Sequence, residues 1–184
     1  MHCPSASVVN LGGIGRLLRL AGRWEGISRL WEPTTEGARE SRSTANVTSI
    51  LEGSFVRIDY TWTFDGEPQE GSLLFGHEEK GDRLTVVWVD TWHMGDRVMV
   101  CRGTGTDGDA LSVRGSYAAP PGPDWGWRTV IEPAGRDSFR MSMYNISPEG
   151  HEVLAVDAMY SRARPSRARP RARKPSARQG PSRT

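Results

Sequence analysis

The chain has 184 residues, which suits one domain, because domains of roughly 100–200 residues bury a self-sufficient core. Its formal net charge of +2 hides an uneven distribution. Nine of the 24 Lys and Arg residues, but none of the 22 acidic residues, lie in residues 161–184, which leaves 15 basic residues against 22 acidic ones upstream. Two cysteines exclude a disulfide framework, and Arg16 and Arg19 interrupt the mildly apolar N-terminal segment, which excludes a membrane span there. We expect a soluble cytoplasmic protein without a membrane partner.

Residues 8–20 are the stretch with helical character. Apolar side chains recur there at helical spacing, namely Leu11, Ile14, Leu17 and Leu18. The neighbouring glycines weaken the helix propensity. We predict a short helix ahead of the first strand.

From residue 22 to residue 162 the dominant pattern is a period-two alternation of apolar and polar residues. The clearest example is residues 54–64, where every second side chain is apolar: Val56, Ile58, Tyr60, Trp62 and Phe64. Turns at 65–68 and 79–82 contain Gly and Asp, which accept the positive φ of tight hairpins. The predicted strands are residues 22–32, 43–53, 54–64, 69–77, 83–93, 97–103, 110–117, 125–132, 138–146 and 151–162.

Antiparallel strands in such a series leave two exposed edges, and closing the sheet into a barrel removes both. We predict an all-β, up-and-down antiparallel barrel of about ten strands, a size that can hold a small ligand. A two-sheet sandwich is the alternative.

The C-terminal segment after Tyr160 contains mainly Ser, Arg, Ala and Pro. Such a composition cannot repay the entropy of folding, so residues 163–184 are predicted to form a disordered basic tail. Its SRARP repeat either binds the phosphate backbone of nucleic acid through charge alone or has no function. The predicted organisation is an N-terminal extension over residues 1–17, a barrel over residues 18–162, and this tail.

The segment LAGRWEG, residues 20–26, resembles the Gly-x-Trp that opens the first strand of lipocalins and related calycin barrels. In those barrels an Arg from the last strand commonly stacks on the Trp and closes the barrel bottom. The resemblance implies that Arg162, in the MYSR segment, stacks on Trp24, a cation–π contact worth about 0.5–2 kcal/mol.

The same region is similar to a bacterial lipocalin-like family catalogued as a domain of unknown function. The matching stretches include LEGSFVRIDYTW, EGSLLFGHEEK, WVDTWH, WGWR and MYNISPEG, and they span residues 18–162. The resemblance implies the barrel fold and supplies no reaction.

Asp90 is the residue of the predicted strand 83–93 that most needs a partner. If the face it shares with Trp88 and Trp92 points into the barrel, the buried carboxylate needs hydrogen-bond donors, a cation or a proton. The candidate cations are Arg57, Arg102 and Arg128. In one interpretation Asp90 anchors a ligand pocket lined by Tyr60, Trp62, Trp88, Trp92, Trp127 and Arg128. In the other, Asp90 ends its strand and binds turn amides, and the aromatic residues are core.

The histidines do not predict a metal site. His-x-His, His-Glu-x-x-His and Cys-x-x-Cys spacings are absent from the sequence. A haem, which needs one axial His, stays open as a cofactor. Asp90 and His93 are three residues apart, an offset that places them on opposite faces of a strand, so we do not expect them to form a catalytic pair.

These observations favour a non-enzymatic carrier or sensor that binds a small apolar or aromatic ligand in the barrel. The alternatives are an enzyme that uses Asp90, with a raised pKa, as acid or base, and a barrel filled by its own side chains that serves as an interaction module. A cavity well under about 300 Å³ argues against the first two, because drug-sized ligands need at least that volume.

Overall fold

The structure is a computed structural model that describes residues 13–32, 36–105 and 110–164. The elements in chain order are α1 (Ile14–Leu18), β1 (Gly22–Leu30), β2 (Arg39–Ile50), the 3-10 helix η1 (Leu51–Gly53), β3 (Phe55–Phe64), β4 (Glu67–Glu78), β5 (Arg83–Asp90), β6 (Met99–Thr104), β7 (Leu111–Tyr117), β8 (Trp125–Pro133), β9 (Ser138–Ile146) and β10 (Glu152–Arg162). All but two of the strands begin and end within about two residues of the expected bounds.

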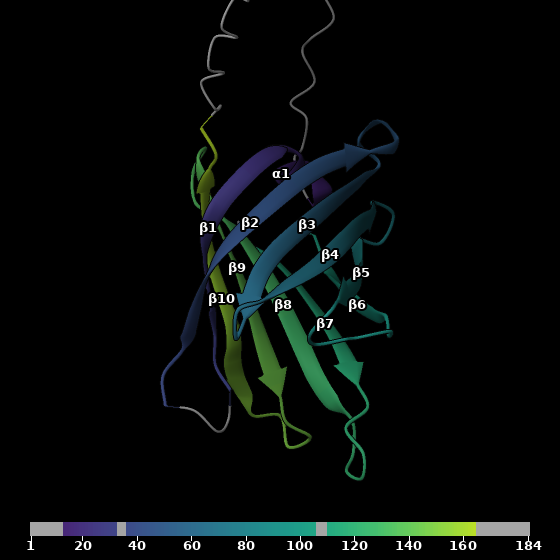
Figure 1. Cartoon of the computed structure of the whole chain (residues 1–184). Helices are drawn as coiled ribbons and strands as arrows, with labels where there is room; N and C mark the ends of the chain where they lie inside the picture. The colour runs from purple at the N-terminus through teal and green to yellow at the C-terminus, as the bar shows by residue number, and fades with distance from the viewer. Residues whose placement is uncertain (1–12, 33–35, 106–109, 165–184) are drawn as a thin grey trace, which may run out of the picture.

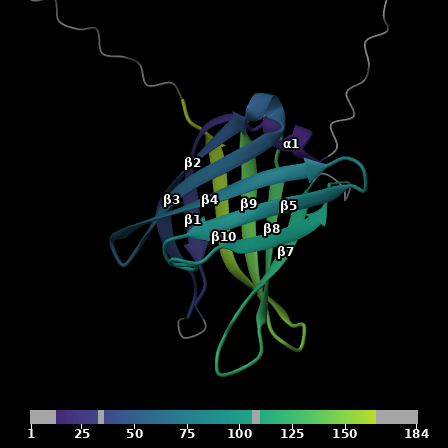
Figure 2. The ribbon, with the colours of Figure 1, turned by 90° about the vertical axis from the view of Figure 1, so that its right-hand side faces the viewer.

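The strands form one closed antiparallel barrel in which each strand pairs with its neighbours along the chain (Figures 1 and 2). Closure comes from pairing of β1 with β10, which runs from Trp24 opposite Arg162 to Leu30 opposite Val156. The predicted barrel is therefore confirmed and the sandwich alternative is wrong. A closed sheet has no unpaired edge to protect, which is the physical advantage of this topology.

The inside of the barrel is a packed hydrophobic core built by the alternation seen in the sequence. On β3, the apolar side chains Val56, Ile58, Tyr60 and Trp62 are buried and the residues between them are partly or fully exposed. The largest fully buried side chains elsewhere include Trp88, Phe75 and Phe139. Because side chains fill the interior, any ligand site must be sought where this packing is incomplete.

One end of the barrel is covered by α1, which is shorter than the predicted helix. Leu17 and Leu20 are buried against the core, and residues 1–12, which contain the rest of that prediction, lie outside the described residues. The side chain of Trp24 is 1% exposed, and its indole Nε1 donates a 2.8 Å hydrogen bond to the carbonyl of Leu20, just after α1. The Arg162 guanidinium carbon lies 4.2 Å from the centre of the Trp24 ring, as the lipocalin resemblance implies.

Two strands differ from the prediction at their ends, and each difference has a physical cause. β2 begins at Arg39, ahead of the predicted residue 43, because its first residues still pair with β1, and it ends at Ile50, before the predicted residue 53, because residues 51–53 form η1. β5 ends at Asp90, although the alternation continues to His93, because residues 91–96 form a turn. The basic tail from residue 165 onward lies outside the described residues, so nucleic-acid binding by it stays a prediction. None of the helices described is long and apolar enough to cross a membrane.

Candidate functional site

Asp90 lies at the end of β5, at the end of the barrel opposite α1, because β1 starts beside α1 and successive strands alternate in direction. Its side chain is fully buried. Oδ1 accepts hydrogen bonds from the backbone N–H groups of Trp92 (2.9 Å) and His93 (2.8 Å), which is the turn-amide arrangement of the second interpretation. The carboxylate thus shapes the turn that follows the strand.

The same carboxylate also contacts the His93 side chain, which corrects the prediction that the two residues lie on opposite faces. His93 Nδ1 is 3.0 Å from Asp90 Oδ1, and the His93 side chain is 12% exposed. The opposite-face argument holds only within a strand, and the chain leaves the strand after Asp90. The turn therefore brings together two groups that a continuous strand would separate.

A chain of hydrogen bonds joins the other carboxylate oxygen to the barrel interior. The Tyr60 hydroxyl donates to Asp90 Oδ2 over 2.7 Å and accepts a bond from Trp88 Nε1 over 2.8 Å. Burial, and after it the nearby charge of Asp90, raise the pKa of Tyr60 well above its usual value, so this hydroxyl stays protonated and able to donate.

The environment of Asp90 keeps it ionised. Burial by itself would raise the pKa of Asp90, but the side chain and backbone N–H of His93, together with the Tyr60 hydroxyl, favour the carboxylate and lower the pKa below its usual value. This direction is opposite to the raised pKa that the acid–base hypothesis assumes for Asp90. An ionised carboxylate only accepts hydrogen bonds, so the Nδ1 of His93 carries a proton and, in a neutral ring, Nε2 is the acceptor.

Gly71 on β4 lies between Tyr60 and Asp90 in the sheet register. A Cβ at this position would lie 2.3 Å from the Tyr60 hydroxyl oxygen, so the hydroxyl occupies space that only glycine leaves free. We expect Gly71→Ala to displace the Tyr60 ring, break its bond to Asp90 and lower the free energy of unfolding by about 1–3 kcal/mol. Urea denaturation measures this.

The matched control for that substitution is Gly122→Ala, whose Cβ would meet nothing closer than a carbonyl oxygen at 3.5 Å. It should stay within about 0.5 kcal/mol of the parent protein. Equal stability of the two variants would show that the Tyr60 ring does not occupy the space beside Gly71.

Aromatic rings surround His93 on several sides. The ring centroid of His93 lies 4.6 Å from that of Trp92, 5.4 Å from Trp127 and 5.5 Å from Trp88. His93 Nε2 and Trp127 Nε1 are both buried, and neither has a hydrogen-bond partner within the part of the chain that the structure describes. Buried polar atoms without partners are rare in native proteins and ask for an explanation.

Two cavities adjoin this cluster. The one inside the barrel, bordered by Asp90, His93 and Tyr160, has a volume of about 10 Å³, which is room for about one water molecule. The other opens at the barrel end and has a volume of about 210 Å³. Its lining residues are Trp88, Trp92, His93, Met94, Met99, Tyr117, Trp127 and Asn145. Side chains therefore fill the barrel interior beside Asp90, and the larger of these two cavities lies at the end of the barrel.

The residues predicted to line the pocket differ in where their side chains point. Tyr60, Trp62, Trp88 and Trp127 point inward and are buried. Trp92 lies in the turn, 37% exposed, with its ring 5.1 Å from that of Phe64, so it shares no strand face with Trp88.

Arg128 does not line the pocket, contrary to the prediction. Its guanidinium pairs with Glu152 and stacks over the Tyr144 ring at 4.2 Å, on the opposite face of β8 from Trp127. Arg57 pairs with Asp59 on the outer face, and Arg102 is exposed. The partners of Asp90 are hydroxyl, amide and imidazole groups instead of an arginine.

Haem does not fit this arrangement. His93 Nε2 has the chemistry of an axial ligand, but a cavity of about 210 Å³ is smaller than the roughly 300 Å³ that even drug-sized ligands need. Among the described residues, no three His, Cys, Asp or Glu side chains come close enough together to hold a metal ion.

Comparison with known protein families identifies the family of this chain. The family described as "Protein of unknown function (DUF1579)" matches residues 15–162. The chain belongs to the DUF1579 family. No curated protein matches the sequence of this DUF1579 protein.

Solved structures resemble the DUF1579 barrel at low sequence identity. Rv2717c from M. tuberculosis superimposes with a TM-score of 0.56 at 16% identity, covering 80% of this chain and 95% of that one. Its likeness shows the fold alone. A protein of unknown function with a hot dog fold from Alicyclobacillus acidocaldarius reaches a TM-score of 0.21 at 8% identity, covering 88% of this chain and 91% of that one, which is too distant to support an argument.

Sequence reasoning missed two polar residues that line the cavity at the barrel end of this DUF1579 protein. Tyr117 ends β7, and its hydroxyl donates a 2.8 Å hydrogen bond to Oδ1 of Asn145 near the end of β9. The alternation contained the signal, because Tyr117 continues the inward face of Leu111 and Val113. The methionines gave no such signal, because Met94 lies in the turn and Met99 begins β6 within an apolar run that shows no alternation with polar residues.

Proposed function

We propose that this DUF1579 protein binds a small planar ligand, about the size of one substituted aromatic ring, in the cavity at the barrel end. The proposal rests chiefly on two buried and unpartnered nitrogens, His93 Nε2 and Trp127 Nε1, in side chains that line this cavity. A lipocalin-like relationship and a cytoplasmic location belong to the same proposal and rest on the sequence.

The two nitrogens determine which hydrogen-bonding groups a ligand must carry. The indole N–H of Trp127 is a donor, and Nε2 of His93 is an acceptor when Asp90 holds the proton on Nδ1. A ligand that offers an acceptor to Trp127 and an O–H or N–H to His93 would satisfy both atoms. Leaving either atom unpaired is unfavourable by about 1–3 kcal/mol, which a matching ligand recovers.

The size of the cavity and its walls favour binding over turnover. A cavity of roughly 150 Å³ in another protein holds benzene, so about 210 Å³ admits one ring with a polar substituent. Indole, phenol and thioether groups form most of the wall and supply apolar and stacking contacts. The described residues of the wall include one imidazole and one phenol but no carboxylate, thiol or serine hydroxyl, and the Tyr117 hydroxyl already donates to Asn145, so a free nucleophile beside His93 is lacking.

The test is a titration of the isotope-labelled full-length protein with phenol, benzamide and toluene, followed by NMR. We expect phenol and benzamide to shift the indole N–H signal of Trp127 and to bind more tightly than toluene. Trp127→Phe keeps a ring and removes the N–H, so it should weaken the two polar probes about fivefold to thirtyfold and leave toluene unchanged.

Trp31→Phe is the matched control, because Trp31 does not line the cavity. It should bind all three probes as the parent protein does. Tighter binding of toluene than of phenol, or shifts confined to residues far from the cavity, would contradict the proposal. Native mass spectrometry of protein purified from its own host then identifies any ligand that it retains.

A further inference from the structure

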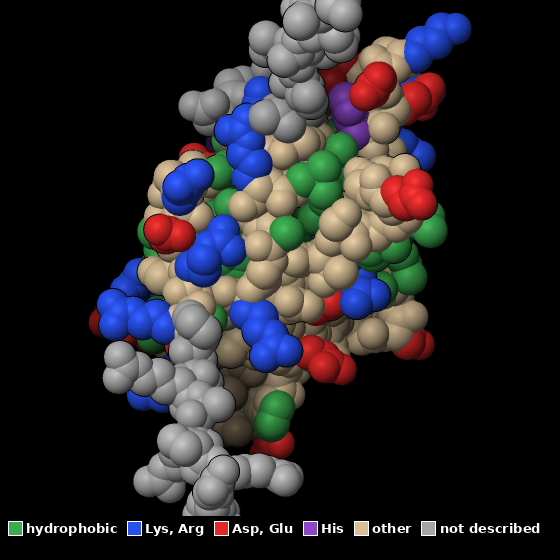
Figure 3. All heavy atoms as spheres, turned by 90° about the horizontal axis from the view of Figure 1, so that it is seen from above, with side chains coloured by type: hydrophobic (Ala, Val, Ile, Leu, Met, Phe, Trp, Pro, Cys, Tyr) green, Lys and Arg blue, Asp and Glu red, His purple; other side chains and the backbone are tan. Residues whose placement is uncertain are grey.

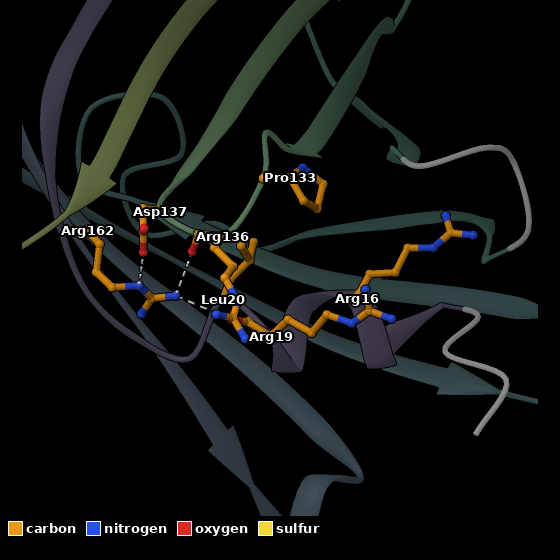
Figure 4. A pocket seen from close by; sticks show the side chains of 8 residues that line it. Arg16, Arg19, Leu20, Pro133, Arg136, Asp137 and Arg162 are labelled. Carbon is orange, nitrogen blue, oxygen red and sulfur yellow. Dashed lines mark hydrogen bonds and ion pairs between the residues drawn. The ribbon is translucent and has the colours of Figure 1, made fainter. Parts of the chain in front are cut away.

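Another cavity, at the α1 end of the barrel, has four arginines among its eight lining residues. It has a volume of about 950 Å³, and its lining residues are Arg16, Arg19, Leu20, Pro133, Gly135, Arg136, Asp137 and Arg162. Figure 4 shows Arg16 and Arg19 coming from α1 and the residues just after it, and Arg162 from the end of β10. We name this cavity the arginine basin. Figure 3 looks onto this end of the molecule, where blue Lys and Arg side chains gather.

Arg162 forms one wall of the arginine basin, and its guanidinium group already has hydrogen-bond partners within the chain. Its Nη1 donates to the carbonyl of Ala21 over 3.0 Å, and Nη2 donates to the carbonyls of Arg136 (3.1 Å) and Arg19 (3.4 Å). Its Nε contacts Asp137 over 3.3 Å. Arg162 therefore ties the end of α1 to the β8–β9 turn and fixes the backbone from which the other arginines project.

The remaining three arginines of the basin have no carboxylate partner within the described part of the chain. Asp137 is the single acidic residue among the described residues of the lining, and it faces Arg162. One guanidinium nitrogen of Arg16, Nη1, is also buried without a hydrogen-bond partner. Arginines without a carboxylate partner favour an anion, and a buried donor without an acceptor is unfavourable, so an anion would complete the basin.

The geometry points to a small phosphate-bearing molecule as the occupant of the arginine basin, and we propose a binding site for this class there. Guanidinium groups present planar forks of N–H donors that match phosphate oxygens, and several arginines can share one polyanion. A volume of about 950 Å³ leaves room for an organic group beside the phosphates, against Leu20 and Pro133. The site is independent of His93, which lies at the other end of the barrel.

Isothermal titration calorimetry of the full-length protein with pyrophosphate, and separately with citrate, tests the proposal. We expect pyrophosphate to bind more tightly than citrate, since phosphate oxygens match the arginine forks, and to bind more weakly as salt is added. Each of Arg16→Gln, Arg19→Gln and Arg136→Gln should weaken pyrophosphate about tenfold, and the triple variant should abolish measurable binding.

The control is Arg102→Gln, which removes an exposed arginine on β6 and should leave the affinity unchanged. Thermal melts verify that the variants fold, which is expected because the three arginines hold no ion pair with a described residue. Binding that survives in the triple variant would assign the anion to other basic residues and overturn the proposal. Equal affinity for citrate would overturn the assignment to phosphate, and no heat with either anion at low salt would overturn the site itself.

Discussion

Asp90→Ala is expected to lower the free energy of unfolding by about 3–5 kcal/mol. The substitution removes a buried carboxylate that accepts bonds from the Tyr60 hydroxyl, the backbone N–H groups of Trp92 and His93, and His93 Nδ1. Buried donors without an acceptor each carry a penalty of about 1–3 kcal/mol, and the four losses overlap because they share one group. Urea denaturation followed by circular dichroism measures the change.

The control for Asp90→Ala is Glu40→Ala, which removes an exposed carboxylate paired with Arg29 over 2.7 Å. An exposed ion pair contributes about 0–1 kcal/mol, so this variant should be nearly as stable as the parent protein. If Asp90→Ala proves as mild as Glu40→Ala, the hydrogen-bond cluster around Asp90 does not form in solution.

The lowered pKa of Asp90 adds a pH dependence to this expectation. A carboxyl group whose pKa is lower in the folded protein than in the unfolded chain stabilises the fold fully above the unfolded value, about 3.9, and loses that contribution as the pH falls through the folded value. The difference in stability between the parent protein and Asp90→Asn should therefore be largest at neutral pH and shrink below about pH 4. A difference that grows on acidification would contradict the lowered pKa.

Trp24→Ala is the second change with a large expected effect. The indole is 1% exposed, packs edge-on against Phe139 with ring centroids 4.9 Å apart, and supports the guanidinium of Arg162 at 4.2 Å. Removing a buried aromatic side chain lowers stability by about 3–5 kcal/mol, and the lost cation–π contact adds about 0.5–2 kcal/mol. The midpoint of thermal unfolding should fall accordingly.

A double-mutant cycle separates the stacking of Arg162 from the packing of Trp24. Trp24→Leu and Arg162→Gln are made singly and together, and unfolding free energies are measured for all four proteins. We expect a coupling of about 0.5–2 kcal/mol between the two positions. Additive effects would show that Arg162 acts only through its bonds to the carbonyls of Ala21, Arg19 and Arg136.

The strands were predictable because their signals are local. On β3, the alternation of Val56, Ile58, Tyr60 and Trp62 with polar residues is found again as alternate burial in the barrel. The end of β5 was placed too late, since alternation alone does not show that a carboxylate will bind the amides two and three residues ahead. A local signal for that turn did exist, in Asp90 followed by Gly95, whose φ of 59° suits glycine.

The sequence by itself determined the number of strands, their order along the chain and, within strands such as β3, which side chains face inward, because each of these follows from patterns within a few residues. The pairing of β1 with β10, which closes the barrel and excludes the sandwich, joins the two ends of the sheet and needs the tertiary structure. Only the tertiary structure decided the candidate sites. His93 meets Asp90 because the chain turns there, and Tyr60 reaches Asp90 from 30 residues away through the register of β3, β4 and β5. Cavity volumes depend on how all ten strands pack, and the arginine basin exists because β10 closes against β1 beside α1. No pattern within a segment of the chain encodes such distances.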